Sequence, residues 1–127
     1  MENLTKVFAV AIGGAIGAVL RYLLNISPLS GIFQSFPLAT FFINISGSFL
    51  VGFLLILFTE KFQSSENLRL AIIVGFLGAY TTFSTFEFET FALVRDKQIV
   101  AAILYVSLSF ALGLIGVFGG VWLGKRF

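Results

Sequence analysis

Residues 75–89 read Gly-Phe-Leu-Gly-Ala-Tyr-Thr-Thr-Phe-Ser-Thr-Phe-Glu-Phe-Glu and interrupt an apolar stretch long enough to cross a bilayer. Four Ser or Thr hydroxyls, two carboxylates and two glycines stand where lipid-facing sequence would carry Leu, Ile and Val. Because an unsatisfied polar group is costly in hydrocarbon, such a segment must face protein or water. The sequence therefore predicts a membrane helix that is broken near its middle and lines an ion path.

The composition places the whole chain in a membrane. Of its 127 residues, 58% are hydrophobic and only 11% are charged, and the mean hydropathy is +1.04. A soluble domain carries roughly 25% charged residues, so these charges are too few to cover a soluble surface. The length predicts one domain, residues 1–127.

Several function classes are excluded by the residue types. The chain has no Cys and no His, which removes thiol and histidine chemistry and most transition-metal sites. The basic residues are scattered singly, which speaks against nucleic acid as a partner. The sequence shows no pairing of a nucleophile with a base of the kind that would indicate an enzyme.

Four apolar stretches reach the roughly 20 residues that a membrane-spanning helix requires. We expect an all-α membrane protein with these spans at about Val7–Leu24, Leu38–Phe58, Leu70–Val94 and Ile99–Leu123. The short turn from Arg95 to Gln98 predicts hairpin-like packing of the third and fourth spans. Four spans place both termini on one side of the membrane.

The charges give only a weak orientation signal. Five Lys or Arg residues lie on the side of the termini and three on the other side. Orientation follows the Lys and Arg bias of the loops. The counts are compatible with cytoplasmic termini and with a chain that inserts in both orientations.

Two series of glycines predict close helix packing. Gly13 and Gly17 form a G-x-x-x-G pair in the first span, and Gly116, Gly120 and Gly124 continue such a series in the fourth. Small residues at this spacing let helix backbones approach closely in membranes. This pattern indicates tight packing and does not identify a substrate.

A polar face runs along the second span. Thr40, Asn44 and Ser48 follow one another at intervals of four residues and therefore share one side of the helix. Asn44 carries two N–H donors and one acceptor. These groups can bond neighbouring helices together, or the donors can replace the water around an anion.

The third span carries a run of hydroxyl residues, Thr81, Thr82, Ser84 and Thr85, that is unusual for one continuous membrane helix. Gly75 and Gly78 permit unwinding just before it. An opened turn frees carbonyls that suit a cation, and N–H groups that suit an anion. Phe83 and Phe86 are neighbours at i, i+3, and their electropositive ring edges can contact an anion.

Other polar residues are candidates for the same path. Glu89 shares a helix face with Thr82 and Phe86, which makes it a better candidate than Glu87 to face a pore vestibule. Tyr105 shares a face of the fourth span with Ser109, although a Ser hydroxyl in a membrane helix commonly bonds back to its own backbone.

The line of hydroxyls in the fourth span stops after Ser109, because Gly113 and Val117 follow at the same spacing. Arg21, near the end of the first span, can extend to the lipid headgroups beside Tyr22 or draw anions toward a vestibule.

At these positions the sequence resembles the Fluc (CrcB) fluoride channel family. The resemblance covers nearly the whole chain, and the Thr-Thr-Phe-Ser-Thr-Phe run at residues 81–86 is its most specific part. The matching positions are Gly13, Gly14, Gly17, Ala18, Arg21, Tyr22, Thr40, Asn44, Gly47, Ser48, Phe49, Gly52, residues 75–78, residues 81–86, Tyr105 and Ser109.

The resemblance implies a passive channel that exports cytoplasmic fluoride and confers fluoride resistance. It implies an antiparallel, dual-topology homodimer in the cell inner membrane, with two pores at the subunit interface. It also implies a structural Na⁺ at the dimer centre, held by the backbone carbonyls of Gly78 and Thr81. The residues expected to line the pores are Asn44, Phe83, Phe86, Tyr105 and Ser109, with Thr40, Thr82 and Glu89 as further candidates.

Four positions depart from the family pattern, namely Ala39, Ala79, Gly113 and Val117. They bear on the rate of conduction more than on the identity of the ion. Two other interpretations are a small four-span proton-coupled multidrug exporter and a membrane scaffold that transports nothing. The exporter requires a carboxylate deep within a span, whereas Glu87 and Glu89 are off-centre.

Overall fold

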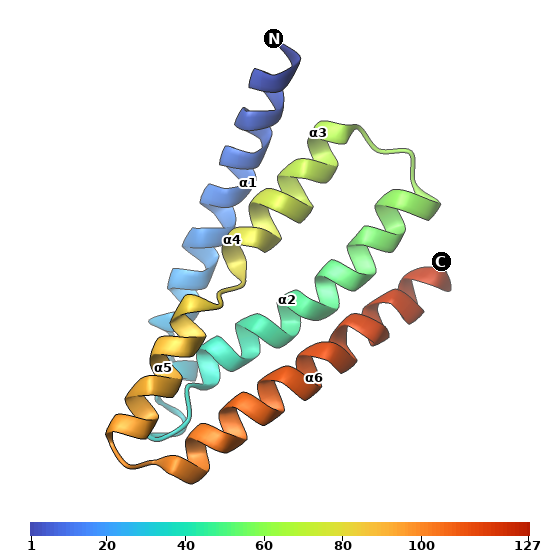
Figure 1. The fold of residues 1–127 in the computed structure, drawn as a ribbon. Helices are drawn as coiled ribbons and strands as arrows, with labels where there is room; N and C mark the ends of the chain where they lie inside the picture. Colours follow the sequence, from blue (N-terminus) through green and yellow to red (C-terminus); the bar gives the residue numbers. More distant parts are fainter.

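The computed structural model describes residues 1–127 and consists of helices and their connections, with four helices long and apolar enough to cross a membrane (Figure 1). The first is α1 (Glu2–Asn25), and the last is α6 (Ile99–Lys125). The second is α2 (Leu38–Ile56), continued by a wider π-helical turn at Leu57–Lys61. The four expected spans and the all-α fold are confirmed.

The third span is assembled from several pieces. A short helix α3 (Glu66–Arg69) leads into π-helical turns at Leu70–Leu77, followed by α4 (Gly78–Tyr80). The helix then breaks, and α5 (Ser84–Arg95) completes the crossing. A 3₁₀ turn at Pro28–Gly31 lies in the loop between α1 and α2.

The break lies three residues later than the glycines suggested. Thr81 has extended backbone angles, with φ −79° and ψ 158°, whereas Gly75 and Gly78 are both helical. The expectation that these two glycines unwind the helix is therefore wrong. Gly75 instead packs against the α1 backbone near Val10 and Gly14. The unwound backbone lies where the Asn44 side chain of α2 satisfies it.

Glycine seams hold the spans together in two pairs. A methyl group placed on Gly13 would collide with the backbone carbonyl of Ala71, so α1 lies directly on the first half of the third span. A methyl group on Gly120 would likewise collide with the Phe49 carbonyl, because α6 lies along α2 (Figure 1). The predicted role of these glycines in close packing is confirmed.

The third and fourth spans form a hairpin only near their connection. Leu93 of α5 packs against Ala102 and Tyr105 of α6, whereas the first half of the third span leaves α6 and packs on α1. The predicted hairpin-like packing is therefore confirmed for α5 and the beginning of α6 and does not extend to the first half of the third span. The break makes this divergence possible, because it lets the two halves of one span contact different neighbours.

Candidate functional site

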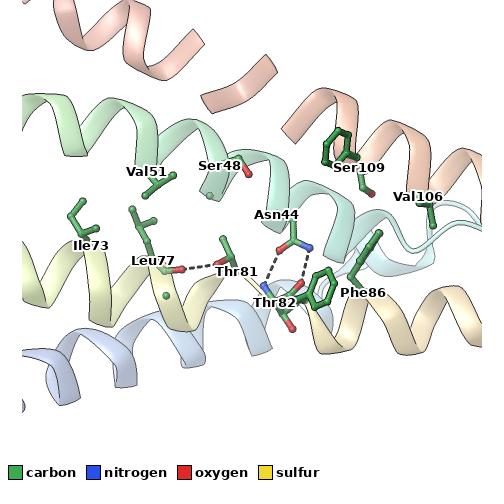
Figure 2. A pocket seen from close by; sticks show the side chains of 14 residues that line it. Asn44, Ser48, Val51, Ile73, Leu77, Thr81, Thr82, Phe86, Val106 and Ser109 are labelled. Carbon is green, nitrogen blue, oxygen red and sulfur yellow. Dashed lines mark hydrogen bonds between the residues drawn. The ribbon is translucent and has the colours of Figure 1, made fainter. Parts of the chain in front are cut away.

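Asn44 closes the break from the neighbouring helix. Its Nδ2 donates to the Thr82 carbonyl at 2.9 Å, and its Oδ1 accepts from the Thr82 backbone N–H at 2.9 Å (Figure 2). The side-chain amide thus pairs with the peptide unit that the helix no longer satisfies. One N–H of Asn44 makes no hydrogen bond within the chain, so the packing interpretation accounts for only part of its donors.

A cavity of about 650 Å³ lies beside this pair, between α2, the broken span and α6 (Figure 2). Both halves of the third span contribute to its wall, and no acidic or basic side chain lines it. The break thus opens a mainly apolar cavity with a few polar groups at membrane depth. The lining residues are Asn44, Gly47, Ser48, Val51, Ile73, Leu77, Gly78, Thr81, Thr82, Phe83, Phe86, Val106, Ser109 and Phe110.

Ser109 brings an unsatisfied hydroxyl to this cavity. Its Oγ is buried and has no hydrogen-bond partner, so the common bond back to its own helix is absent here. A buried hydroxyl without a partner is costly. A ligand that accepts a hydrogen bond would relieve this cost.

Two aromatic rings from α5 and its N-terminal flank frame the same cavity. The ring centroids of Phe83 and Phe86 lie 6.2 Å apart at an angle of 40°, which confirms that the two are neighbours. Phe83 is 70% exposed although it lies in a membrane span. Its ring is therefore available to a ligand or to another chain.

A second polar cluster lies behind Phe86 and outside the cavity wall. Tyr105 is fully buried and donates from its hydroxyl to Glu89 Oε1 at 3.0 Å. Its ring centroid lies 5.0 Å from that of Phe86. Thr40 is also fully buried, and its hydroxyl has no partner. The predicted pore residues thus form two clusters, and Phe86 contacts both.

Arg21 makes a contact that the sequence analysis did not predict. Its Nε donates at 2.9 Å to the carbonyl of Ala79, in the last turn before the break. A cation at the carbonyl end of a helix interacts favourably with the helix dipole, and its N–H groups can satisfy an otherwise unpaired carbonyl. The structure therefore gives Arg21 a position from which it stabilises α4, and its role toward anions stays a prediction.

The carbonyls of Gly78 and Thr81 remain free. Helix breaks leave the last carbonyls unpaired, and no N–H of the chain donates to these two. A methyl group built on Gly78 would meet nothing within 4 Å. This edge of the break is thus open and exposes two carbonyl oxygens, which are the kind of ligand that a hard cation prefers.

Sequence comparison identifies the family. A model described as "CrcB-like protein, Camphor Resistance (CrcB)" matches residues 8–121. The chain belongs to the CrcB family. It is 45% identical over 120 residues to the "Fluoride-specific ion channel FluC" of Roseiflexus sp. (strain RS-1), covering 94% of this chain and 97% of that protein.

Two further CrcB relatives carry the same name. That of Hydrogenovibrio crunogenus is 39% identical over 125 residues, which covers 98% of this chain and 95% of that protein. That of Methylococcus capsulatus is 45% identical over 121 residues, which covers 95% of this chain but only 53% of that longer protein. The chain therefore spans nearly the full length of some relatives and about half of another.

Sequence reasoning also missed a contact beside the break. The hydroxyl of Tyr80, the last helical residue before it, lies 2.9 Å from Ser46 Oγ of α2. Ser46 also bonds back to the Ile43 carbonyl, so Tyr80 acts as the donor to Ser46. Neither residue lies on the Thr40–Asn44 face, and nothing in the local sequence indicated that they meet.

Proposed function

We propose that this chain is a passive, fluoride-selective channel that lets cytoplasmic fluoride leave the cell down its electrochemical gradient and so confers resistance to fluoride. The observation that supports this most directly is the cavity at the break, which presents hydrogen-bond donors without partners at membrane depth. The Ser109 hydroxyl and the second N–H of Asn44 are such donors. The relatives named fluoride-specific ion channels supply the identity of the ion.

The mechanism follows from the chemistry of the lining. Fluoride is small and strongly hydrated, so a pore must offer donors in place of its water. Asn44, Ser109 and Thr82 present amide and hydroxyl groups, and the rings of Phe83 and Phe86 present electropositive edges. Since no carboxylate lines the cavity, its wall does not repel an anion.

The alternative of a proton-coupled drug exporter lacks this support. Such an exporter needs an acidic group in its substrate site, but Glu89 bonds to Tyr105 and lies outside the cavity wall. The relatives are named channels and not enzymes. Passive flux through a channel also requires no nucleotide site.

The channel acts as an antiparallel homodimer in the cell inner membrane, with two pores. One chain offers only a lateral cavity with an exposed Phe83 on its rim, so a second copy is needed to close a pathway. Because the chain has no cysteine, a single Cys placed at Lys97 reports orientation by labelling from either side of the membrane. Dual insertion predicts comparable labelling from both sides, and labelling from one side alone contradicts it.

A structural Na⁺ belongs at the centre of that dimer. The free carbonyls of Gly78 and Thr81 fit a hard cation, and two carbonyls per chain require the second copy to complete the shell. The ion would neutralise carbonyls that otherwise abut. Replacing Na⁺ by a large organic cation during reconstitution should dissociate or inactivate the dimer, and an unchanged dimer would contradict the site.

The decisive experiment on ion identity is anion efflux from liposomes that hold the purified protein. We expect rapid fluoride release and chloride release no faster than from protein-free liposomes. Chloride passing as readily as fluoride would reject the selectivity. Liposomes that stay tight to fluoride, with assembled protein present, would reject the function.

A further inference from the structure

One face of α6 loses its polar groups one turn beyond Ser109. Residues 105, 109, 113 and 117 recur every four positions and lie along one side of the helix. Tyr105 and Ser109 carry hydroxyls, whereas Gly113 and Val117 do not. One helical turn beyond Ser109, about 6 Å further along the axis, α6 itself offers no donor.

A hydroxyl of the neighbouring helix lies opposite this gap. A Cβ built on Gly113 would lie 3.5 Å from Ser48 Oγ, and no other atom outside α6 would lie within 4 Å of it. Ser48 stands one turn from Asn44 on the same face of α2 and lines the same cavity as Ser109 (Figure 2). The side chains of Asn44, Ser48 and Ser109 thus line one cavity.

The Ser48 hydroxyl is free, whereas several other hydroxyls of these spans bond back to their own helix. Ser46 bonds to the Ile43 carbonyl, Thr81 to the Leu77 carbonyl and Thr90 to the Phe86 carbonyl. Ser48 makes no hydrogen bond to any group of the chain. A hydroxyl in a membrane helix ordinarily bonds back to its own helix. Ser48 and Ser109 make no such bond, and both line the same cavity.

We propose that Ser48 of α2 supplies, opposite Gly113, the hydroxyl donor that α6 lacks, and that it forms an anion-binding position continuous with Asn44 and Ser109. This assignment rests on the proposed fluoride channel. Ser48 and Gly113 are complementary: the Ser48 hydroxyl faces the position of α6 at which a side-chain donor is absent. A hydroxyl on either helix would then serve the same position.

Moving the hydroxyl from one helix to the other tests this assignment. Ser48→Ala should lower fluoride efflux from liposomes about tenfold, in line with the loss of a hydrogen bond to a charged group. Gly113→Ser in the Ser48→Ala background should restore most of the lost rate. Serine fits at position 113, because its only close neighbour is the oxygen that the first substitution removes.

Two controls separate this effect from packing. Ser107→Ala removes a hydroxyl from an exposed position of α6 that does not line the cavity, and it should leave the rate unchanged. Gly113→Ala with Ser48→Ala fills the same space without a hydroxyl and should not restore the rate. The thermal stability of each variant in detergent should not fall below that of the unsubstituted chain, since each substitution introduces a residue of higher helix propensity.

Each outcome decides the assignment. Fluoride efflux unchanged by Ser48→Ala, or a loss that Gly113→Ser fails to restore in a folded variant, overturns the role of Ser48. Either result, with rapid fluoride release by the unsubstituted chain, leaves the proposed function standing. If the unsubstituted chain itself releases no fluoride, the proposed function fails first.

Discussion

Neighbouring helix backbones meet in opposite ways at the glycine seams and at the break at Thr81–Phe83. Along the seams, backbone touches backbone: Gly52 lies against the Val117 carbonyl, and Gly120 lies against the Phe49 carbonyl. At the break, side chains such as Asn44 hold the backbones apart and satisfy them individually. The seams therefore exclude any ligand, whereas the break leaves a cavity with free donors.

The difference shows how a small bundle can be both rigid and permeable. Lipid offers no hydrogen bonds, so every polar group must be paired by protein or used by a ligand. The seams leave few polar groups to pair, because glycine contributes none beyond its backbone. The break concentrates those that remain in one place, which makes it the natural location for an anion path.

The largest expected effect comes from breaking a seam. Gly120→Ala puts a methyl group against the Phe49 carbonyl and the Phe53 backbone nitrogen, neither of which can rotate away. Overpacking costs about 1–3 kcal/mol or more, and backbone obstacles place this variant at the upper end. We expect a large loss of folded protein in size-exclusion chromatography and a lowered unfolding temperature.

The adjacent glycine is a matched control. A Cβ on Gly119 would lie 4.0 Å from the Phe49 ring, which is ordinary contact. Gly119→Ala should therefore fold like the unsubstituted chain. Equal stability of the Gly119 and Gly120 variants would contradict the account of the seam.

A smaller effect, on flux and not on folding, is expected at the rim of the cavity. Phe83→Ile removes an electropositive ring edge, and fluoride efflux should fall roughly tenfold if that edge contributes about 1.4 kcal/mol to ion transfer. Phe86→Ile should impair flux as well, and it also removes the contact with Tyr105.

Phe88 supplies the comparison for this prediction. It is 64% exposed, close to the 70% of Phe83, but it does not line the cavity. Phe88→Ile should leave efflux unchanged. A similar loss from both variants would mean that the ring of Phe83 matters only as a bulky surface group.

The last expected effect, on stability, concerns the hydrogen bond from Arg21 of α1 to the Ala79 carbonyl before the break. Arg21→Gln removes the charged donor to the Ala79 carbonyl, which should cost about 1–2 kcal/mol of stability, because Arg21 is only partly buried. Thermal unfolding in detergent measures this loss. Arg95→Gln removes an exposed pair with Asp96 and a contact at 5.9 Å with the centroid of the Phe91 ring, and it should give a much smaller shift than Arg21→Gln. Indistinguishable shifts would remove Arg21 from the account.

Much of the fold was predictable from sequence, because it depends on local patterns. Hydropathy located the four spans, and the hydroxyl run placed a break between residues 75 and 89. Spacing alone put Gly120 in a seam and made Phe83 a neighbour of Phe86.

What could not be predicted depends on residues far apart in the chain. The break follows the Asn44 amide, 38 positions away from Thr82, and not the glycines that precede it. The bond from Arg21 to Ala79 spans 58 positions. Which spans pair also depends on how glycine surfaces match, and no single segment encodes that match.

The central claim is that the polar groups gathered at the break carry fluoride across the membrane. Its most direct test is fluoride efflux from liposomes that hold equal amounts of assembled protein, for the unsubstituted chain and for Asn44→Leu. The account predicts fast release by the first and near-background release by the second, which lacks both the free N–H and the bonds to Thr82. Release by the Asn44→Leu variant at the rate of the unsubstituted chain would contradict it.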